Sequence, residues 1–259
     1  MQAYKFESRG EWGASPSPAP VLLSRCTVMP HDSKTDRRDV PRYTPLEAAH
    51  HLSLPVSTVR AWSIGQRSRQ DGKPRFFQPL IAPARKTPVS LSFWNLVELY
   101  VLRALRRTHD LPMPKVRAAL RYTGEKLGAR RPLIEETFYT DGINLLVERL
   151  ASLIDTSDGQ TVMRGVLVDS LKRVERGTDG RVVRLYPWLN EPTEVRAVEI
   201  DPDRAFGRLV LTGTGVPTEA IAERFAEGDD VEDLAHDYEL DPARIQQALR
   251  WEQRAARAA

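Results

Sequence analysis

Side chains able to hydrogen-bond to bases and phosphates recur on one face of the segment 56–62. The other face is apolar at positions i, i+3 and i+6, which are Val56, Val59 and Trp62. The polar face carries Ser57, Thr58 and Arg60. Arginine and hydroxyl side chains read base edges and bind phosphates, so this segment has the features of a recognition helix for the major groove of DNA.

The preceding segment supplies the helix that must position this face. Thr44 and Glu47 form a capping box around Pro45, which is favoured at the first helical position. Ala48 and Ala49 are small enough for a second helix to cross closely, and Pro55 opens that helix. The sequence predicts a helix-turn-helix, in which we expect Thr44 to lie at the DNA as well.

A segment rich in Gly and Pro follows, from residue 65 to residue 89. Its apolar centre predicts a small hairpin, a wing, formed around Arg75, Phe76, Phe77, Leu80 and Ile81. We expect its cations to face the DNA backbone: Arg67, Arg69, Lys73, Arg75, Arg85 and Lys86. The alternative is a solvated basic loop.

The two halves of the chain carry net charges of opposite sign. Residues 1–130 carry 22 Lys and Arg against 10 Asp and Glu, whereas residues 131–259 carry 16 against 25. A basic half suits a phosphate backbone, and an acidic half suits a protein partner. Either half taken alone could also be an ordinary solvated surface.

Composition excludes several classes of protein. The single cysteine, Cys26, excludes an internal disulfide framework and a Cys-rich zinc site. No stretch approaches the roughly 20 apolar residues of a membrane span, and the N-terminal residues contain no hydrophobic run of the length that a secretory signal needs. We expect a cytoplasmic protein of bacterial type with no membrane partner.

The pattern predicts a mainly α protein with small β elements, an α+β fold in four parts. Residues 1–41 form a flexible segment, 42–128 the DNA-binding domain, 129–190 a small α+β linking or dimerisation unit, and 191–259 a three-helix domain. Within the second part, Phe93 to Leu105 gives an amphipathic helix opened by Ser92. In the third part, Asp141-Gly142 predicts a hairpin over 138–143, 162–174 a helix, and 182–185 a strand.

The last part is helical and acidic. Three short helices begin at Pro217, at Asp229 or Asp230, and at Asp241, and the first of them buries Ile221, Ala222 and Phe225. Residues 191–259 hold 16 acidic against 8 basic side chains, so we expect this part to bind protein rather than DNA.

Catalysis has little support in the sequence. The histidines have no carboxylate or cysteine partner at ligand spacing: His31, His50, His51, His109 and His236. The acidic run 229–239 lacks the calcium-loop pattern, and Gly213 and Gly215 have no phosphate-loop lysine. We expect no enzyme activity, metal or cofactor.

Two resemblances add to this reading. The segment Tyr43 to Leu127 resembles the MerR-type winged helix-turn-helix. The resemblance rests on the sequence stretches TPLEAA, LP and STVRAW, which are followed by a wing. The segment Asp201 to Trp251 resembles a small domain of VapB-like type II antitoxins, a domain formerly labelled as of unknown function. It matches at Gly213-Thr214, Val216-Pro217 and Gly228, but has Gly215 where the family usually has arginine.

The combination implies an antitoxin that neutralises a PIN-like, VapC-type ribonuclease toxin and represses its own operon by binding operator DNA. It would act as a homodimer or a toxin–antitoxin hetero-oligomer. Arginines that could enter the toxin's acidic metal site are Arg37, Arg38, Arg250, Arg254 and Arg257, although these are equally explained as tail or helix-end charges. Two alternatives stay open, a MerR-type transcriptional regulator without a toxin and a pure protein-interaction adaptor.

Overall fold

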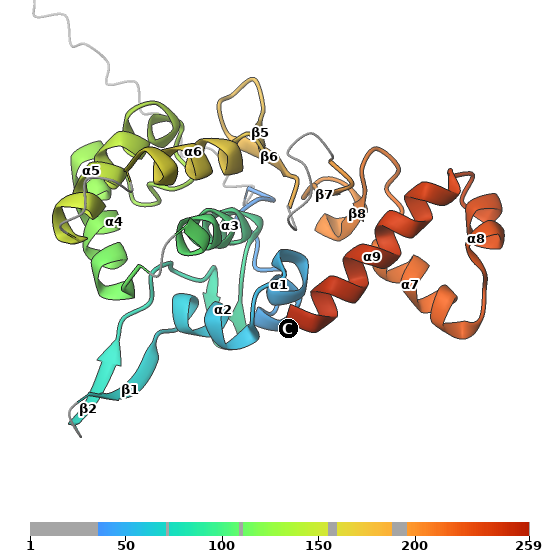
Figure 1. The fold of residues 1–259 in the computed structure, drawn as a ribbon, viewed down its shortest axis with the longest axis horizontal. Helices are drawn as coiled ribbons and strands as arrows, with labels where there is room; N and C mark the ends of the chain where they lie inside the picture. Colours follow the sequence, from blue (N-terminus) through green and yellow to red (C-terminus); the bar gives the residue numbers. More distant parts are fainter. Residues whose placement is uncertain (1–35, 71–72, 109–110, 155–159, 188–195, 259) are drawn as a thin grey trace, which may run out of the picture. The chain divides into compact units, whose positions relative to one another are not determined.

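The structure is a computed structural model that describes residues 36–70, 73–108, 111–154, 160–187 and 196–258. It is mainly helical with small antiparallel sheets, which confirms the α+β class (Figure 1). No helix within these ranges is long and apolar enough to cross a membrane. The predicted flexible segment lies outside the described residues up to residue 35.

The helix-turn-helix forms as the sequence predicts. Helix α1 (Pro45–Leu52) begins at the capping box, in which the Thr44 hydroxyl accepts from the backbone N–H of Glu47 and the Glu47 carboxylate accepts from that of Thr44. Helix α2 (Val56–Ser63) follows Pro55 and buries Val59 and Trp62. Ala48 and Ala49 have no exposed surface, so the two helices cross closely.

Two hairpins follow α2. The longer one pairs β1 (Gln66–Gln70) with β2 (Lys73–Phe77) and projects beyond the helices in Figure 1. Its entry needs glycine at residue 65, where φ is +92° and a Cβ atom would lie 2.6 Å from the Phe76 ring. The shorter hairpin pairs β3 (Arg85–Lys86) with β4 (Val89–Ser90).

Helix α3 (Phe93–Thr108) is the centre of the described structure. The apolar face predicted for the amphipathic helix from Phe93 to Leu105 is buried, but Leu99 and Leu102 on the opposite face of the helix are buried as well. The reason is that α3 packs against α1 on one side and α6 on the other (Figure 1), so its first three turns are buried on nearly all sides, the polar Asn95 and Glu98 included.

Helices α4 (Met113–Leu127), α5 (Ile143–Ile154) and α6 (Gln160–Leu171) complete this helical layer. The hairpin predicted over 138–143 is wrong, because Phe138–Gly142 forms a π-helical turn that continues into α5. Phe138 is fully buried against Gly142 and Leu127. Burying this ring outweighs the local turn preference of Asp-Gly.

A four-stranded antiparallel sheet in the order β5-β6-β7-β8 connects the middle of the chain to its end. Its strands are β5 (Val174–Arg176), β6 (Val182–Leu185), β7 (Val198–Ile200) and β8 (Leu209–Leu211). The strand predicted over 182–185 is confirmed, whereas Val174 starts a strand rather than ending the preceding helix. The strands come from both of the segments 129–190 and 191–259.

The chain ends in three helices, α7 (Thr218–Glu227), α8 (Val231–Asp237) and α9 (Pro242–Ala258). Pro217 and Asp230 precede the first two as predicted, and the Asp230 carboxylate accepts from the N–H of Asp233. The prediction that Phe225 is buried is wrong, since it is 42% exposed. The second half of α9 packs against α1 (Figure 1).

Candidate nucleic-acid interface

The polar face of α2 presents Ser57 and Arg60 to solvent, as predicted. The prediction that Thr58 lies on the outer face is wrong, because its side chain is buried and its hydroxyl accepts a 3.3 Å hydrogen bond from Arg106 Nη1. Thr58 therefore ties α2 to α3 instead of facing outward. The Thr44 hydroxyl is occupied by the capping box at the start of α1.

Hairpin β1–β2 carries cations on both of its faces. The register pairs Arg67 with Phe76 and Arg69 with Pro74, so these two arginines share one face. Lys73 and Arg75 alternate with them on the other face, where the Arg75 guanidinium lies 5.7 Å from the centre of the Phe77 ring. Such a two-sided basic arm can follow a phosphate backbone.

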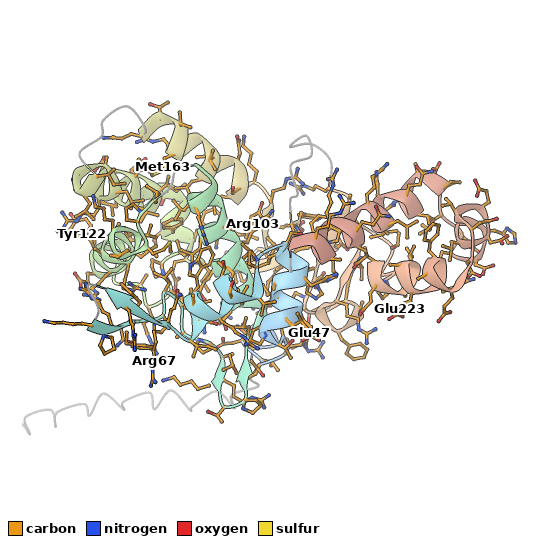
Figure 2. All side chains as sticks on the ribbon, turned by 60° about the horizontal axis from the view of Figure 1, so that its bottom comes forward. Glu47, Arg67, Arg103, Tyr122, Met163 and Glu223 are labelled. Carbon is orange, nitrogen blue, oxygen red and sulfur yellow. The ribbon has the colours of Figure 1, made fainter. Side chains whose placement is uncertain are left out.

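Four cations of this surface have no carboxylate partner among the described residues. In the described ranges, Arg60, Arg67, Arg69 and Lys73 form no ion pair with a carboxylate, and all four are exposed. Figure 2 shows Arg67 on the hairpin on one side of α1 and Glu223 of helix α7 on the other. The basic arm and the acidic last helices thus lie on opposite sides of α1.

Arg85 and Lys86, predicted to belong to the same wing, lie on the separate hairpin β3–β4. Both are exposed, and Arg85 Nη2 donates a 2.9 Å hydrogen bond to Ser90 Oγ. A contact with DNA by this pair would be independent of the β1–β2 arm.

Two basic residues that the sequence reading missed are Arg117 and Arg121 on α4. They line a concavity of about 600 Å³ against the hairpin, together with Arg69, Arg75 and Phe76. Burial and the charge of Arg121 lower the pKa of Arg117, whose Nη2 donates to the carbonyl of Gln78. Their i, i+4 spacing on one helix face was the signal available in the sequence.

The arginines predicted to enter a partner's metal site have different environments. Arg38 is partly buried and has partners within the chain, because the Asp36 carboxylate accepts from its Nε at 2.8 Å and its guanidinium lies 6.0 Å from the Trp94 ring centre. Arg37 is exposed and 3.3 Å from Asp203. Arg250, Arg254 and Arg257 are exposed on α9.

The described residues contain no group of three or more His, Cys, Asp or Glu side chains placed to hold a metal ion. Within these ranges, the most perturbed carboxyl group is that of Glu98 on α3. Burial raises its pKa to about 7, partly offset by the nearby charge of Arg131 and a hydrogen bond from Asn95.

A histidine pair lies where α1 meets α9. His50 Nε2 is 2.7 Å from Glu252 Oε2, and the hydrogen bond to Glu252 raises the pKa of His50. The Thr218 hydroxyl donates to Glu252 Oε1 at 2.5 Å, which joins α7 to the same contact. Burial lowers the pKa of the adjacent His51 to about 4.

Comparison with known families matches two segments of the chain. Residues 41–120 match a family described as "Putative DNA-binding HTH domain", which contains α1, α2, both hairpins and α3. Residues 198–251 match a family described as "Protein of unknown function (DUF433)", which covers β7, β8, α7, α8 and most of α9.

A relative with a similar span is the "Putative antitoxin VapB45" of Mycobacterium tuberculosis, 28% identical over 82% of this chain and 94% of its own. The fold is also similar to the crystal structure titled Rv2018 from Mycobacterium tuberculosis. That similarity has a TM-score of 0.59 at 22% identity and covers 81% of this chain and 97% of the other. The helix-turn-helix and the antitoxin likeness expected from the sequence are therefore supported by independent comparisons.

Proposed function

We propose that this chain is an antitoxin that binds operator DNA through α2 and hairpin β1–β2 and neutralises a PIN-like ribonuclease by direct contact. The observation that carries the DNA half is that Arg60, Arg67, Arg69 and Lys73 are exposed and form no ion pair with a carboxylate in the described ranges. In this arrangement Arg60 reads bases, while Arg67, Arg69, Lys73 and Arg75 bind phosphates.

The antitoxin half is supported by likeness and by charge. The relative named as a VapB45 antitoxin is similar over most of both chains. Residues 196–258 carry 14 Asp and Glu against 8 arginines, so this part complements a basic protein surface and repels DNA. A ribonuclease needs a basic surface to hold RNA.

The domain assignment belongs to the same proposal. Residues 42–128 form the DNA-reading part and 191–259 the partner-binding part, with 129–190 linking them and supporting a homodimer. Arg85, Lys86, Arg117 and Arg121 add backbone contacts beside the arm.

The DNA half is tested by measuring binding of the full chain to the DNA upstream of its own gene, and to random DNA, by fluorescence anisotropy. Several phosphate contacts should make affinity fall ~10³-fold or more between 50 and 200 mM salt. An affinity that does not change with salt concentration, or an equal affinity for both DNAs, would exclude operator recognition through this surface.

The partner half is tested by co-expressing the chain with the product of each flanking gene and measuring the mass of the purified complex. A stoichiometric complex with a protein that stops growth when expressed alone is the expected result. If only sequence-specific DNA binding is found, the chain is a transcriptional regulator without a toxin.

One observation favours that second candidate. A cavity of about 530 Å³ lies between α4 and the segment leading from the hairpin, with Glu98 and several arginines in its wall. A small molecule bound there would contact the base of the hairpin. Loss or gain of operator affinity on adding a metabolite, with no partner protein, would distinguish a ligand-responsive regulator from an antitoxin.

A further inference from the structure

An exposed phenylalanine stands in the connection between β7 and β8. Phe206 is 85% exposed, the highest value among the large apolar side chains in the described part of the chain. Phenylalanine is usually buried, because its ring gains free energy on leaving water. A ring held almost wholly in solvent is unfavourable unless something covers it.

The backbone under this ring is strained. Ala205 has φ of +44°, Phe206 +56° and Gly207 +73°, so three successive residues adopt a left-handed conformation. Residues with a Cβ atom disfavour this region, and consecutive left-handed residues are rare. Strain of this kind persists only where the surroundings impose it, and it concentrates at functional positions.

The start of the helix-turn-helix holds the turn in place. Tyr43 Oη donates a 2.8 Å hydrogen bond to the carbonyl of Gly207, and Arg42 Nη1 donates a 3.0 Å bond to that of Pro202. A Cβ atom on Gly207 would lie 2.4 Å from Tyr43 Oη, so the turn is pressed against this tyrosine. The aromatic ring is therefore presented on a fixed backbone, which reduces the entropy lost on binding.

The charge of the part that carries the turn favours a protein as the occupant. Next to the ring the charges are offset within the chain, because Arg204 lies 3.9 Å from Asp201 and 4.0 Å from Glu199, and Asp203 lies 3.3 Å from Arg37. Residues 196–258 as a whole carry 14 Asp and Glu against 8 arginines. Such a part repels DNA and attracts a basic protein surface.

We infer that Phe206 is the anchor that inserts into an apolar pocket on a protein partner whose surface is basic. The inference rests on the proposed function, because the partner it describes is the ribonuclease of that proposal. Rigid aromatic side chains that enter a pocket dominate the affinity of many protein interfaces.

The test uses the full chain, the proteins encoded by the two flanking genes, and the variants Phe206→Gly and Phe206→Trp. Glycine removes the ring and also relieves the positive φ, so Phe206→Gly should melt at the same temperature as the wild type or higher. It should bind the partner at least 10-fold more weakly with unchanged DNA affinity. Phe206→Trp should retain partner binding, and Val162→Ala, at an exposed apolar residue of α6, is the matched control.

The outcomes separate the two proposals. If the wild type binds a flanking protein and Phe206→Gly binds it within twofold as tightly, the anchor is overturned while the antitoxin function stands. If the wild type binds neither protein, both are overturned. If Phe206→Gly loses only DNA affinity, Phe206 inserts into DNA. If it loses only self-association, Phe206 contacts a second copy of the chain. Either result also overturns the inference.

Discussion

Arg60 differs from the exposed cations of the two hairpins because it projects from the proposed recognition helix α2. We expect Arg60→Ala to cost about 1 to 3 kcal/mol of binding free energy on the preferred operator and little on random DNA, since a side chain that reads a base contributes only where the right base is present. Titrations of both DNAs measure the difference. Arg164→Ala, at an exposed arginine of α6, is the matched control. An equal effect on both DNAs would mean that Arg60 binds a phosphate.

Glu98 should make the fold less stable as the pH rises. Its folded pKa is about 7 because of burial, whereas an unfolded glutamate has a pKa of about 4.3. The folded state therefore keeps a proton that the unfolded state has lost, so stability falls between these two pH values and is constant above them.

Glu98→Gln removes that loss while its side-chain oxygen can still accept from Asn95. We expect the variant to be more stable than the wild type by roughly 1 to 3 kcal/mol at pH 8 and equal to it at pH 4. Urea unfolding at both pH values measures this. A less stable variant at pH 8 would mean that the ionised carboxylate is stabilised by Arg131.

Individual orientations were the least predictable feature of the candidate site. The apolar stripe of α2 follows from helical spacing, and it placed Ser57 and Arg60 correctly outside. Thr58 lies at the edge of that stripe, and Arg106, 48 residues away, draws its hydroxyl inward. Similarly, Phe225 has the spacing of a core residue but remains 42% exposed. Neither outcome depends on local sequence.

At the scale of elements, the two hairpins should make separable contributions to DNA binding. Arg67→Gln with Arg69→Gln on β1 should weaken operator and random DNA alike. The slope of log affinity against log salt should fall by about 0.9 for each phosphate that the variant no longer neutralises. Arg85→Gln with Lys86→Gln on hairpin β3–β4 measures the contribution of the second hairpin, and Arg164→Gln on α6 is the control. If only the β3–β4 pair changes the salt slope, the β1–β2 arm does not lie on the backbone.

Most helices were predictable because capping residues or prolines mark their first turns in the sequence. The capping box at Thr44, the prolines at 55 and 217, and Asp230 each lie at the observed boundary. The error at 138–143 arose because a turn signal is local and the burial of Phe138 is not. The pairing of β6 with β7 could not be foreseen either, since it joins segments that look separate along the chain.

For the whole molecule, the contact of His50 with Glu252 predicts a pH-dependent part of the stability. The folded pKa of His50 is raised by Glu252, and that of Glu252 is lowered despite burial, by bonds from His50 and Thr218. The pair is therefore fully stabilising between the unfolded glutamate pKa of about 4.3 and the unfolded histidine pKa of about 6.5. Its contribution disappears as the pH rises through the folded pKa of His50.

His50→Gln should cost about 1 to 3 kcal/mol near pH 6 and clearly less at pH 9. His51 has the opposite effect on stability, in the wild type and in the variant. Its folded pKa is about 4, so the free energy of unfolding decreases as the pH falls below about 6.5, the pKa of an unfolded histidine. The difference between wild type and variant reports the contact of His50 with Glu252, together with the effect of the His50 charge on His51. Thermal unfolding across this range measures it, with His236→Gln on α8 as the exposed control. A difference independent of pH would mean that His50 contributes by packing alone.

The contact between α9 and α1 also limits how such proteins can be recombined. Helix α9 packs against α1 of the helix-turn-helix, and Tyr43 donates a hydrogen bond to the turn that carries Phe206. A chimaera that grafts residues 196–258 onto an unrelated DNA reader would have to supply a helix with the shape and histidine of α1. We therefore expect related chains to inherit the two parts as a unit, with substitutions on α1 matched by substitutions on α9.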